Sequence, residues 1–481
     1  MILFVGDGMG ISTVTASRIF EGQLGGKSGE ENVLSFERLP YTALIKTYNT
    51  DQQTPDSAGT MTAIVTGVKT RAGALSVSQA VQPGDHARVA GNRLATIVEL
   101  AERAGLSTGI VTTTHVTHAT PAACYAHSPD RYWEDDSAMP PAAVKADFPD
   151  IARQLVEFPF GDGMDIVLGG GRRHFLPAGV SDPEYGDLSG FRNDGRDLTA
   201  EWSDRPLAAY VWNKAQFDDI DVTVTGHLLG LFEHSHMHFE HDRADDAAGE
   251  PSLSAMTSKA IDLLSRNPKG YFLMVEGGRI DHAHHAANAY RALTETIEFA
   301  RAVEIALNKT DSAHTLVIVT ADHDHSLAIV GHAVRGNPIL GKVMASAAQG
   351  EAAGAPGGAS SRLAVDALGL PYTALVYASG PGYTGASLGQ PEGPKHAVHW
   401  GCGFQGITMG RPDLTDVDTQ SPDYLQECAI PMLEAAHSGA DVAVYAGGPR
   451  AHLFHGVLEQ NVIFHVMIDA LGLPPQPVPG N

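Results

Sequence analysis

The sequence is poor in cysteine and in long apolar runs, and each shortage excludes a class of protein. Its 481 residues contain three cysteines, Cys124, Cys402 and Cys428, without the CxxC spacing of a zinc ribbon. Cys402 and Cys428 fit a disulfide that leaves Cys124 reduced, and two unpaired buried thiols fit equally well, so cysteine does not fix the compartment. No uninterrupted apolar run reaches the roughly 18 residues of a membrane-spanning helix, which predicts a chain without a membrane span.

Basic residues are also scarce, because 56 acidic residues face 32 Lys and Arg and the net charge is −24. This charge disfavours stable binding to nucleic acid or to anionic membranes. An acidic surface fits a salty, marine or halophilic setting, and an ordinary soluble acidic protein fits the composition as well. The opening residues already have the pattern of a core strand, with no charged and apolar leader before them. We interpret the sequence as a mature form from which an export signal has been removed.

The strongest local signal lies between residues 272 and 307. Residues 272–275 are apolar and end at a glycine pair, which predicts a buried strand, and the segment after them has the apolar spacing of a long helix. Glu276, Asp281 and His285 lie at this junction. If Asp281 and His285 are on the helix, they are four residues apart, share one face and reach a single ion.

Two further apolar strands end in acidic residues. Asp322 and His323 follow the strand near residues 315–321, and Asp7 follows the opening strand in GDGMG. Because ligands of open α/β sheets bind along the carboxyl ends of the strands, we expect these acids to lie close together. Carboxylates packed at one edge must be protonated or neutralised by cations. Mixed Asp and His ligands suit Zn²⁺ and an all-oxygen set suits Mg²⁺, so the pattern predicts a metal site. The alternative is that each acid caps the next helix.

Three polar features allow two interpretations each. Ser57 in PDSAGT either caps a helix with its hydroxyl or presents that hydroxyl as a nucleophile at a helix N-terminus, which favours anions. Arg131, which follows a strand near residues 107–114, is either a surface ion-pair partner or a fork for two phosphate oxygens. The histidines at 234, 236, 238 and 241 form an imidazole patch or, as we expect, a solvated face.

Six motifs occur in the order GDGMG, PDSAGT, HATPAACYAHSPDR, VEGGRIDHAHH, TADHDH and HSGADVAVYA. Together they closely resemble the alkaline phosphatase family over almost the whole chain. His118, His282 and the segment YRALTETIEFARA are more similar to the animal-type and marine bacterial branch than to the enteric bacterial type. The resemblance implies a mostly parallel α/β sheet flanked by helices on both faces. It also implies a core of residues 1–330, an inserted crown lobe of residues 331–436, and a closing strand and helix within residues 437–481.

The resemblance implies two Zn²⁺ and one Mg²⁺ per chain. The ligands of one zinc would be Asp281, His285 and His437. Those of the second zinc would be Asp7, Asp322, His323 and the Ser57 oxygen. The magnesium ligands would be Asp7, Thr120 and Glu276. His118 and His282 would lie just behind these ligands, against metal-bound water or phosphate. A peripheral Ca²⁺ site would use Glu184, the Phe232 carbonyl, Glu233 and, after a short insertion, Glu250.

The implied activity is hydrolysis of phosphate monoesters to an alcohol and inorganic phosphate through a phosphoserine at Ser57, with Arg131 binding the phosphate. The family further implies a secreted or periplasmic protein that is commonly a dimer through the crown side. The nearest alternative is a phosphodiesterase or sulfatase of the same superfamily, although serine with Arg131 suits a dianionic monoester better. A metal-binding protein with an inactive site is the alternative outside enzymes.

Overall fold

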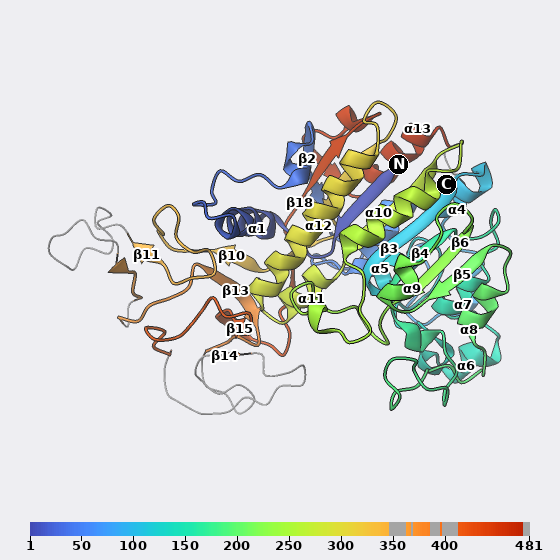
Figure 1. The fold of residues 1–481 in the computed structure, drawn as a ribbon, viewed down its shortest axis with the longest axis horizontal. Helices are drawn as coiled ribbons and strands as arrows, with labels where there is room; N and C mark the ends of the chain where they lie inside the picture. The colour runs from blue at the N-terminus through green and yellow to red at the C-terminus, as the bar shows by residue number, and fades with distance from the viewer. Residues whose placement is uncertain (346–361, 367–368, 385–394, 397–411, 475–481) are drawn as a thin grey trace.

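The structure, a computed structural model, describes residues 1–345, 362–366, 369–384, 395–396 and 412–474. A ten-stranded sheet forms its centre (Figure 1), in the order β19-β2-β18-β8-β1-β7-β3-β4-β6-β5. Its strands are β1 (Ile2–Gly6), β2 (Tyr41–Lys46), β3 (Ser107–His115), β4 (Ile166–Gly170), β5 (Ala208–Val211), β6 (His227–Leu231), β7 (Tyr271–Gly277), β8 (Val317–Ala321), β18 (Val442–Gly447) and β19 (Val457–Glu459). Only β18 runs antiparallel to its neighbours, so the predicted mostly parallel sheet is confirmed.

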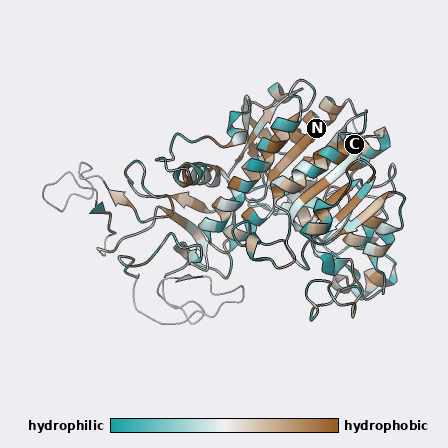
Figure 2. Cartoon of the chain, viewed as in Figure 1, coloured by the Kyte–Doolittle hydropathy of each residue, from teal (hydrophilic) through white to brown (hydrophobic). Residues whose placement is uncertain are grey.

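Helices cover both faces of this sheet. The helices α1 (Ile11–Leu24), α10 (Leu253–Leu264) and α12 (Ala289–Lys309) form one layer, which lies in front of the strands in Figure 1. The other layer contains α2 (Ser57–Thr66), α4 (Ile97–Ala104), α5 (Ala119–Ala122) and α13 (Val462–Leu471). Every residue of β1, β7 and β8 is buried, and the strands are the brown centre of Figure 2. Continuous apolar runs are expected for strands that are covered on both sides.

A smaller sheet adjoins the core beside α1 and α12. It has the order β10-β13-β16, with β10 (Leu327–Ile329), β13 (Leu375–Gly380) and β16 (Cys428–Pro431). Tyr377 and Leu293 pack together in the apolar cluster that joins it to the helices. Much of the predicted crown, at 346–361, 367–368, 385–394 and 397–411, lies outside the described residues, so the division into core and crown stays a prediction.

The structure describes two of the three cysteines. Cys124 and Cys428 are buried free thiols among the described residues. Cys402 lies outside the described residues, so its pairing with Cys428 stays a prediction. In the part of the chain that is described, no helix combines the length and the apolar character needed to cross a bilayer.

The sequence pattern missed part of the sheet. Residues 177–250 have the acidic, loop-rich sequence of a connection, yet they contain β5, β6, α8 (Leu198–Ser203) and α9 (Lys214–Asp218). The β6 sequence HLLGL is too short to show a period, and its strand character comes from parallel pairing with β4 and β5.

Glu102 in α4 makes the stability of this fold depend on pH. Burial raises the pKa of Glu102 from 4.5 to about 8, although the Thr108 hydroxyl donates to its Oε1 at 2.5 Å. The folded state therefore binds this proton more tightly than the unfolded state, and the stability it contributes is lost as pH rises from 4.5 through 8. We expect Glu102→Gln to raise the melting temperature at pH above 8 and to change it little near the acidic end of that window. Glu304→Gln, at an exposed position of α12, is the control and should be neutral throughout.

Candidate active site

Three parallel strands deliver the predicted acids to one edge. β1 lies between β7 and β8, with Gly6 opposite Gly277 on one side and opposite Ala321 on the other. Asp7 and Asp322 therefore leave neighbouring strands at the same level, and Glu276 is the penultimate residue of β7. This parallel register brings side chains that are as far apart in the sequence as Asp7 and Asp322 into one site.

The helix α11 (Arg279–His285) starts directly after β7 and carries Asp281 and His285 one turn apart. The Asp281 Oδ2 lies 3.2 Å from His285 Nε2. His437, in the short strand β17 (His437–Ser438), places its Nε2 3.1 Å from His285 Nε2 and 3.5 Å from Asp281 Oδ1. The spacing predicted for Asp281 and His285 therefore puts both side chains on one face, with His437 opposite.

The imidazole contacts in this group indicate a cation. His285 Nδ1 lies 2.6 Å from the Ala435 carbonyl, and His437 Nδ1 lies 2.8 Å from the Pro55 carbonyl. Carbonyls only accept, so both Nδ1 atoms carry a hydrogen and the two Nε2 atoms point at each other at 3.1 Å. Without an ion a proton must lie between these two nitrogens, and although burial acts against it, the Asp281 carboxylate raises the pKa of His285 to about 9. A metal ion would take the place of this proton, and two nitrogens with a carboxylate suit zinc.

A second group gathers around the Ser57 hydroxyl. His323 Nε2 lies 3.3 Å from Ser57 Oγ, 3.4 Å from Asp7 Oδ1 and 3.3 Å from Asp322 Oδ2. The backbone N–H of Gly8 donates to the other Asp322 oxygen at 3.1 Å. Among the residues that the structure describes, neither buried oxygen of Asp7 has a hydrogen-bond partner. Unpaired buried carboxylate oxygens are the donors that a metal ion would satisfy.

A third group lies on the other side of Asp7. The hydroxyls of Thr112 and Thr114 donate to Glu276 Oε2, the latter at 3.1 Å. The second Glu276 oxygen and the Thr120 hydroxyl are buried without a partner in the described part of the chain. Donor atoms of Asp7, Glu276 and His118 all lie within 4.8 Å of one another. The oxygen donors of this group suit magnesium.

Burial of these acids shifts their pKa values strongly in the absence of a cation. Burial, with the neighbouring Asp322, raises the pKa of Asp7 well above its usual range. Burial also raises the pKa of Asp322 to about 6 and that of Glu276 to about 7. For Asp281 burial acts in the same direction, but His285 and His325 outweigh it and hold the pKa well below its usual range. The donor set thus fits divalent cations, which stabilise all the ionised carboxylates at once.

Ser57 is the first residue of α2, and Asp56 is its N-cap. The backbone N–H of Gly59 donates to Asp56 Oδ1 at 3.0 Å. The interpretation of Ser57 as an ordinary side-chain cap is therefore wrong, because Asp56 satisfies the orphan N–H. The Ser57 hydroxyl instead points towards His323, at the positive end of the helix dipole.

Arg131 is largely buried, with 13 % of its side chain exposed. Its NH1 lies 3.3 Å from Asp56 Oδ2, and its NH2 donates to His118 Nε2 at 3.0 Å. Arg131 is thus an ion-pair partner, as one of the two interpretations holds, but a largely buried one that does not lie on the surface. The second expected supporting histidine, His282, accepts from Arg279 NH1 at 2.9 Å, and its ring centre lies 5.5 Å from that of His118.

Sequence reasoning missed His325. This residue lies in β9 (Asp324–His325), opposite His437 in β17. Its Nε2 lies 2.6 Å from Asp281 Oδ1, which orients that carboxylate. The signal was present in TADHDH, where His325 is two residues beyond His323 and so on the same side of an extended segment.

The residues predicted for calcium form a separate acidic cluster. Donor atoms of Glu233, His238, Asp246 and Glu250 lie within 4.8 Å of one another, and Glu184 accepts from Arg172 NH2 at 3.0 Å. Phe232, the first residue after β6, is buried immediately before Glu233. Asp246 and His238 were not predicted as members of this cluster.

The predicted solvated histidine face is wrong in most of its members. His234 is buried, and the ring of His236 stacks on that of His115 with centres 3.6 Å apart. His238 Nδ1 lies 3.4 Å from Glu250 Oε1, and only His241 is exposed. These histidines lie in a bent segment after β6 that packs against the core, and polarity alone did not show this.

An open α/β sheet whose strand ends present a buried serine beside carboxylates and imidazoles defines a metal-dependent hydrolase. A family model described as alkaline phosphatase matches residues 1–473. The chain is 42 % identical to an alkaline phosphatase of Gadus morhua, over 97 % of this chain and 90 % of that protein. It is also 42 % identical to the tissue-nonspecific alkaline phosphatase of Homo sapiens, over 97 % of this chain and 82 % of the relative.

Solved structures agree with these sequence relatives. The alkaline phosphatase of Thermus thermophilus is 25 % identical, with a TM-score of 0.65 over 99 % of this chain and 91 % of that chain. A cold-active alkaline phosphatase from Shewanella is 25 % identical, with a TM-score of 0.62 over 98 % and 99 % of the two chains. The chain belongs to the alkaline phosphatase family, and it is a metal-dependent phosphoric monoester hydrolase.

Proposed function

We propose that this phosphatase hydrolyses monoesters through a phosphoserine at Ser57, with two Zn²⁺ and one Mg²⁺ bound per chain. Asp281, His285 and His437 would hold one zinc, and Asp7, Asp322 and His323 the other, next to the Ser57 oxygen. Asp7, Thr120 and Glu276 would hold magnesium. The observation that carries the proposal is the Ser57 hydroxyl, which lies 3.3 Å from His323 Nε2 at the start of α2, where Asp56 provides the cap.

Bound cations would supply the charge that offsets the carboxylates, lower the pKa of the serine hydroxyl and of water, and stabilise negative charge on the phosphoryl oxygens. A net positive centre also accounts for the binding of a dianion by a chain of net charge −24. Two histidines outside the set of metal ligands would support the site. His118 accepts a hydrogen bond from Arg131, and His282 accepts one from Arg279.

In the first step Ser57 Oγ loses its proton and attacks phosphorus. The Oγ–P bond forms while the bond from phosphorus to the leaving alcohol oxygen breaks, and that oxygen takes up a proton. The Arg131 guanidinium presents two N–H groups to two phosphoryl oxygens, and Asp56 and His118 fix its position. In the second step a water oxygen attacks the same phosphorus, Ser57 Oγ leaves and regains a proton, and inorganic phosphate departs.

The intermediate is tested by acid quenching. Enzyme mixed with excess monoester, stopped in acid and digested should yield phosphate on the peptide that contains Ser57, detected by mass spectrometry. A phosphate-free Ser57 peptide during steady turnover, with the label on a different residue, would contradict the assignment. Quenched enzyme without substrate is the control and should carry no phosphate.

We further propose a peripheral Ca²⁺ site at Glu184, the Phe232 carbonyl, Glu233 and Glu250, with Asp246 as an added ligand. Burial raises the pKa of Glu184 to about 8 and that of Glu250 to about 7, as expected for acids that lack a cation. His238, between Glu233 and Glu250, is the competing positive group. Melting temperatures with and without calcium test the site, and identical values with Zn²⁺ and Mg²⁺ present would reject it.

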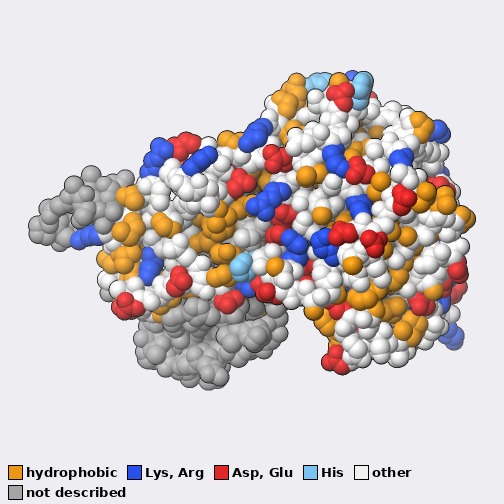
Figure 3. Space-filling model, viewed as in Figure 1, with side chains coloured by type: hydrophobic (Ala, Val, Ile, Leu, Met, Phe, Trp, Pro, Cys, Tyr) orange, Lys and Arg blue, Asp and Glu red, His pale blue; other side chains and the backbone are white. Residues whose placement is uncertain are grey.

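The same family relationship supports a secreted or periplasmic protein and a homodimer that pairs through the crown side. Around β16, Ile430, Met432 and Leu433 are exposed, Leu433 by 85 %. Hydrophobic side chains also lie between charged ones on the part of the surface around the small sheet (Figure 3). Light scattering tests the dimer, since a monomeric mass would exclude it, and fractionation of the native cells tests the location.

A further inference from the structure

A second cluster of metal-ligating side chains lies outside the proposed catalytic centre. It contains His115 at the end of β3, Glu134 in the loop after Arg131, and His174 in the 3-10 helix η3 (Arg172–His174). These residues are 19 and 40 positions apart in the sequence, yet one ligand atom from each meets at a common point. His115 is 2 % exposed and His174 is 4 % exposed, so water has little access to either imidazole.

The distances within the cluster match those around a tetrahedral metal ion. His115 Nδ1 lies 2.8 Å from Glu134 Oε2, His174 Nε2 lies 3.3 Å from the same oxygen, and the two nitrogens lie 3.3 Å apart. Ligands about 2.0 to 2.1 Å from a tetrahedral zinc are about 3.3 Å from one another. The triangle of ligand atoms is therefore of the size that one zinc ion spans.

Supporting contacts orient the ring nitrogens towards this point. His174 Nδ1 lies 2.6 Å from Asp135 Oδ2, a carboxylate oxygen that accepts, so the Nε2 lone pair faces Glu134. His115 Nε2 lies 3.1 Å from Ser235 Oγ and 3.3 Å from Arg173 NH2, so His115 Nδ1 is free to bind an ion when Nε2 donates to the serine and carries the hydrogen when Nε2 accepts from Arg173. A histidine whose outer nitrogen donates to a carboxylate or hydroxyl has the arrangement typical of metal ligands.

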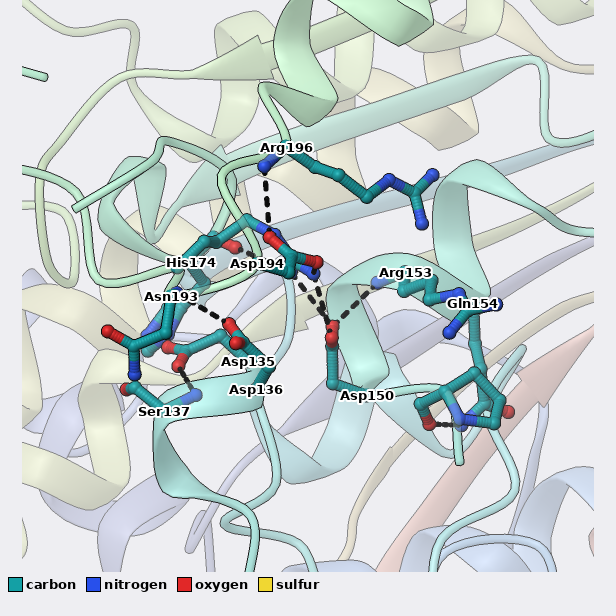
Figure 4. Close-up of polar contacts among 12 residues, drawn as sticks. Asp135, Asp136, Ser137, Asp150, Arg153, Gln154, His174, Asn193, Asp194 and Arg196 are labelled. Carbon is teal, nitrogen blue, oxygen red and sulfur yellow. Dashed lines mark hydrogen bonds and ion pairs between the residues drawn. The ribbon is translucent and has the colours of Figure 1, made fainter. Parts of the chain in front are cut away.

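The surrounding carboxylates are paired with guanidinium groups, whereas Glu134 Oε2 accepts from the Thr117 hydroxyl at 2.6 Å and lies against two imidazoles. Figure 4 shows His174 and Asp135 beside a network in which Asp150 accepts from the Arg153 backbone at 2.8 Å. Arg192 forms ion pairs with Asp150 at 2.9 Å and with Asp194 at 2.5 Å. Among the described residues, the ion-pair partners of Glu134 within 4.0 Å are His115 and His174. Burial lowers the pKa of His115 to about 4, so its ring is neutral and available as a ligand.

We propose that His115, Glu134 and His174 bind a further divalent cation of the zinc class, in addition to the ions at the catalytic centre. Two imidazole nitrogens and one carboxylate oxygen form a three-ligand set with one open tetrahedral position. The ion joins the end of β3, the loop that follows Arg131, and η3. The ion therefore fixes the position of Glu134, which lies three residues after Arg131. The further consequence, that Arg131 is held in place for phosphate binding, rests on the proposed function.

A metal-free hydrogen-bond network is the alternative. Arg173 Nε lies 3.2 Å from His174 Nε2, and Arg173 NH2 lies 3.3 Å from His115 Nε2. A guanidinium that donates to both rings holds them together without an ion. The two arrangements differ in zinc content and in electron density at the centre of the triangle.

Zinc is measured directly, in the full-length enzyme saturated with Zn²⁺ and Mg²⁺ and then freed of unbound ions. Anomalous diffraction at the zinc edge should show a peak between His115 Nδ1, Glu134 Oε2 and His174 Nε2, about 2 Å from each. By elemental analysis, Glu134→Gln and His174→Gln should each lose one zinc equivalent per chain relative to the wild type. Because the readout is metal content, it does not depend on whether Ser57 is the nucleophile.

His127→Gln is the matched control. His127 is also a buried histidine that contacts a glutamate, with Nε2 2.7 Å from Glu99 Oε1, and its Nδ1 lies 2.7 Å from the Ser76 carbonyl. It has no third ligand in the described residues, and its variant should keep every zinc equivalent. A map without a peak in the triangle while the catalytic centre is filled overturns the proposal. So does an unchanged zinc content in Glu134→Gln, or an equal loss in the control. If His174→Gln fails to fold, the wild-type map decides alone.

Discussion

Replacement of Ser57 with alanine is expected to lower the turnover number by on the order of 10⁴-fold or more, because the chain loses its nucleophile. The zinc content should stay close to that of the wild type, since Asp7, Asp322 and His323 remain. Initial rates on an aryl phosphate monoester and elemental analysis of the same preparation measure the two quantities. Asp56 caps α2 in the variant as in the wild type, so the loss is expected without unfolding.

Ser17→Ala is the matched control for this change. Ser17 is a buried serine in α1 whose hydroxyl has no partner among the described residues. Like Ser57→Ala, Ser17→Ala removes one buried hydroxyl oxygen, and it should leave the turnover rate near that of the wild type. Turnover of Ser57→Ala at the wild-type level would reject Ser57 as the nucleophile, and loss of both activity and zinc would show that the serine is needed to build the site.

Removal of the bound metals is expected to have an effect of similar size. Chelation with EDTA should abolish activity, and zinc together with magnesium should restore it. Without cations, Asp7, Asp322 and Glu276 are buried carboxyl groups with raised pKa values. The apo-enzyme should therefore unfold at a lower temperature, because ligands that bind only the native state stabilise it.

The order of addition separates the two metals. Zinc alone should restore part of the activity, because the zinc ligands surround Ser57 and His285, whereas magnesium alone should restore little. Rates and melting curves after each addition, with metal content measured throughout, provide the test. Full activity in protein shown to be metal-free would falsify the scheme.

The sequence predicted the centre of the site better than its surroundings. Apolar strands that end in Asp7, Glu276 and Asp322 predicted a shared sheet edge, because parallel strands align their carboxyl ends. The spacing of Asp281 and His285 predicted a common helix face. These inferences succeeded because each depends on the geometry of one element or on the rule for one sheet.

The failures concern contacts between distant segments. The segment around His236 was predicted to be solvated, yet His236 stacks on His115 because the chain after β6 returns across the end of β3. Ser57 had the pattern of a cap, and the actual cap is the preceding Asp56, which also pairs with Arg131 from another loop. Helix-capping propensity is similar for two adjacent residues such as Asp56 and Ser57, so it cannot show which of them caps the helix when a tertiary ion pair positions one of them.

By itself the sequence determined the α/β class, the family, the strand ends that carry acids and the serine that faces them. Strand and helix periods are local properties, and the acids follow directly from where the strands stop. Only the tertiary structure decided which histidines share a ligand point, as with His325 beside Asp281 and with His115 and His174 around Glu134. The physical reason is that metal coordination requires positions within a few ångströms. The order of strands in the sheet sets those positions for residues that lie tens of positions apart in the chain.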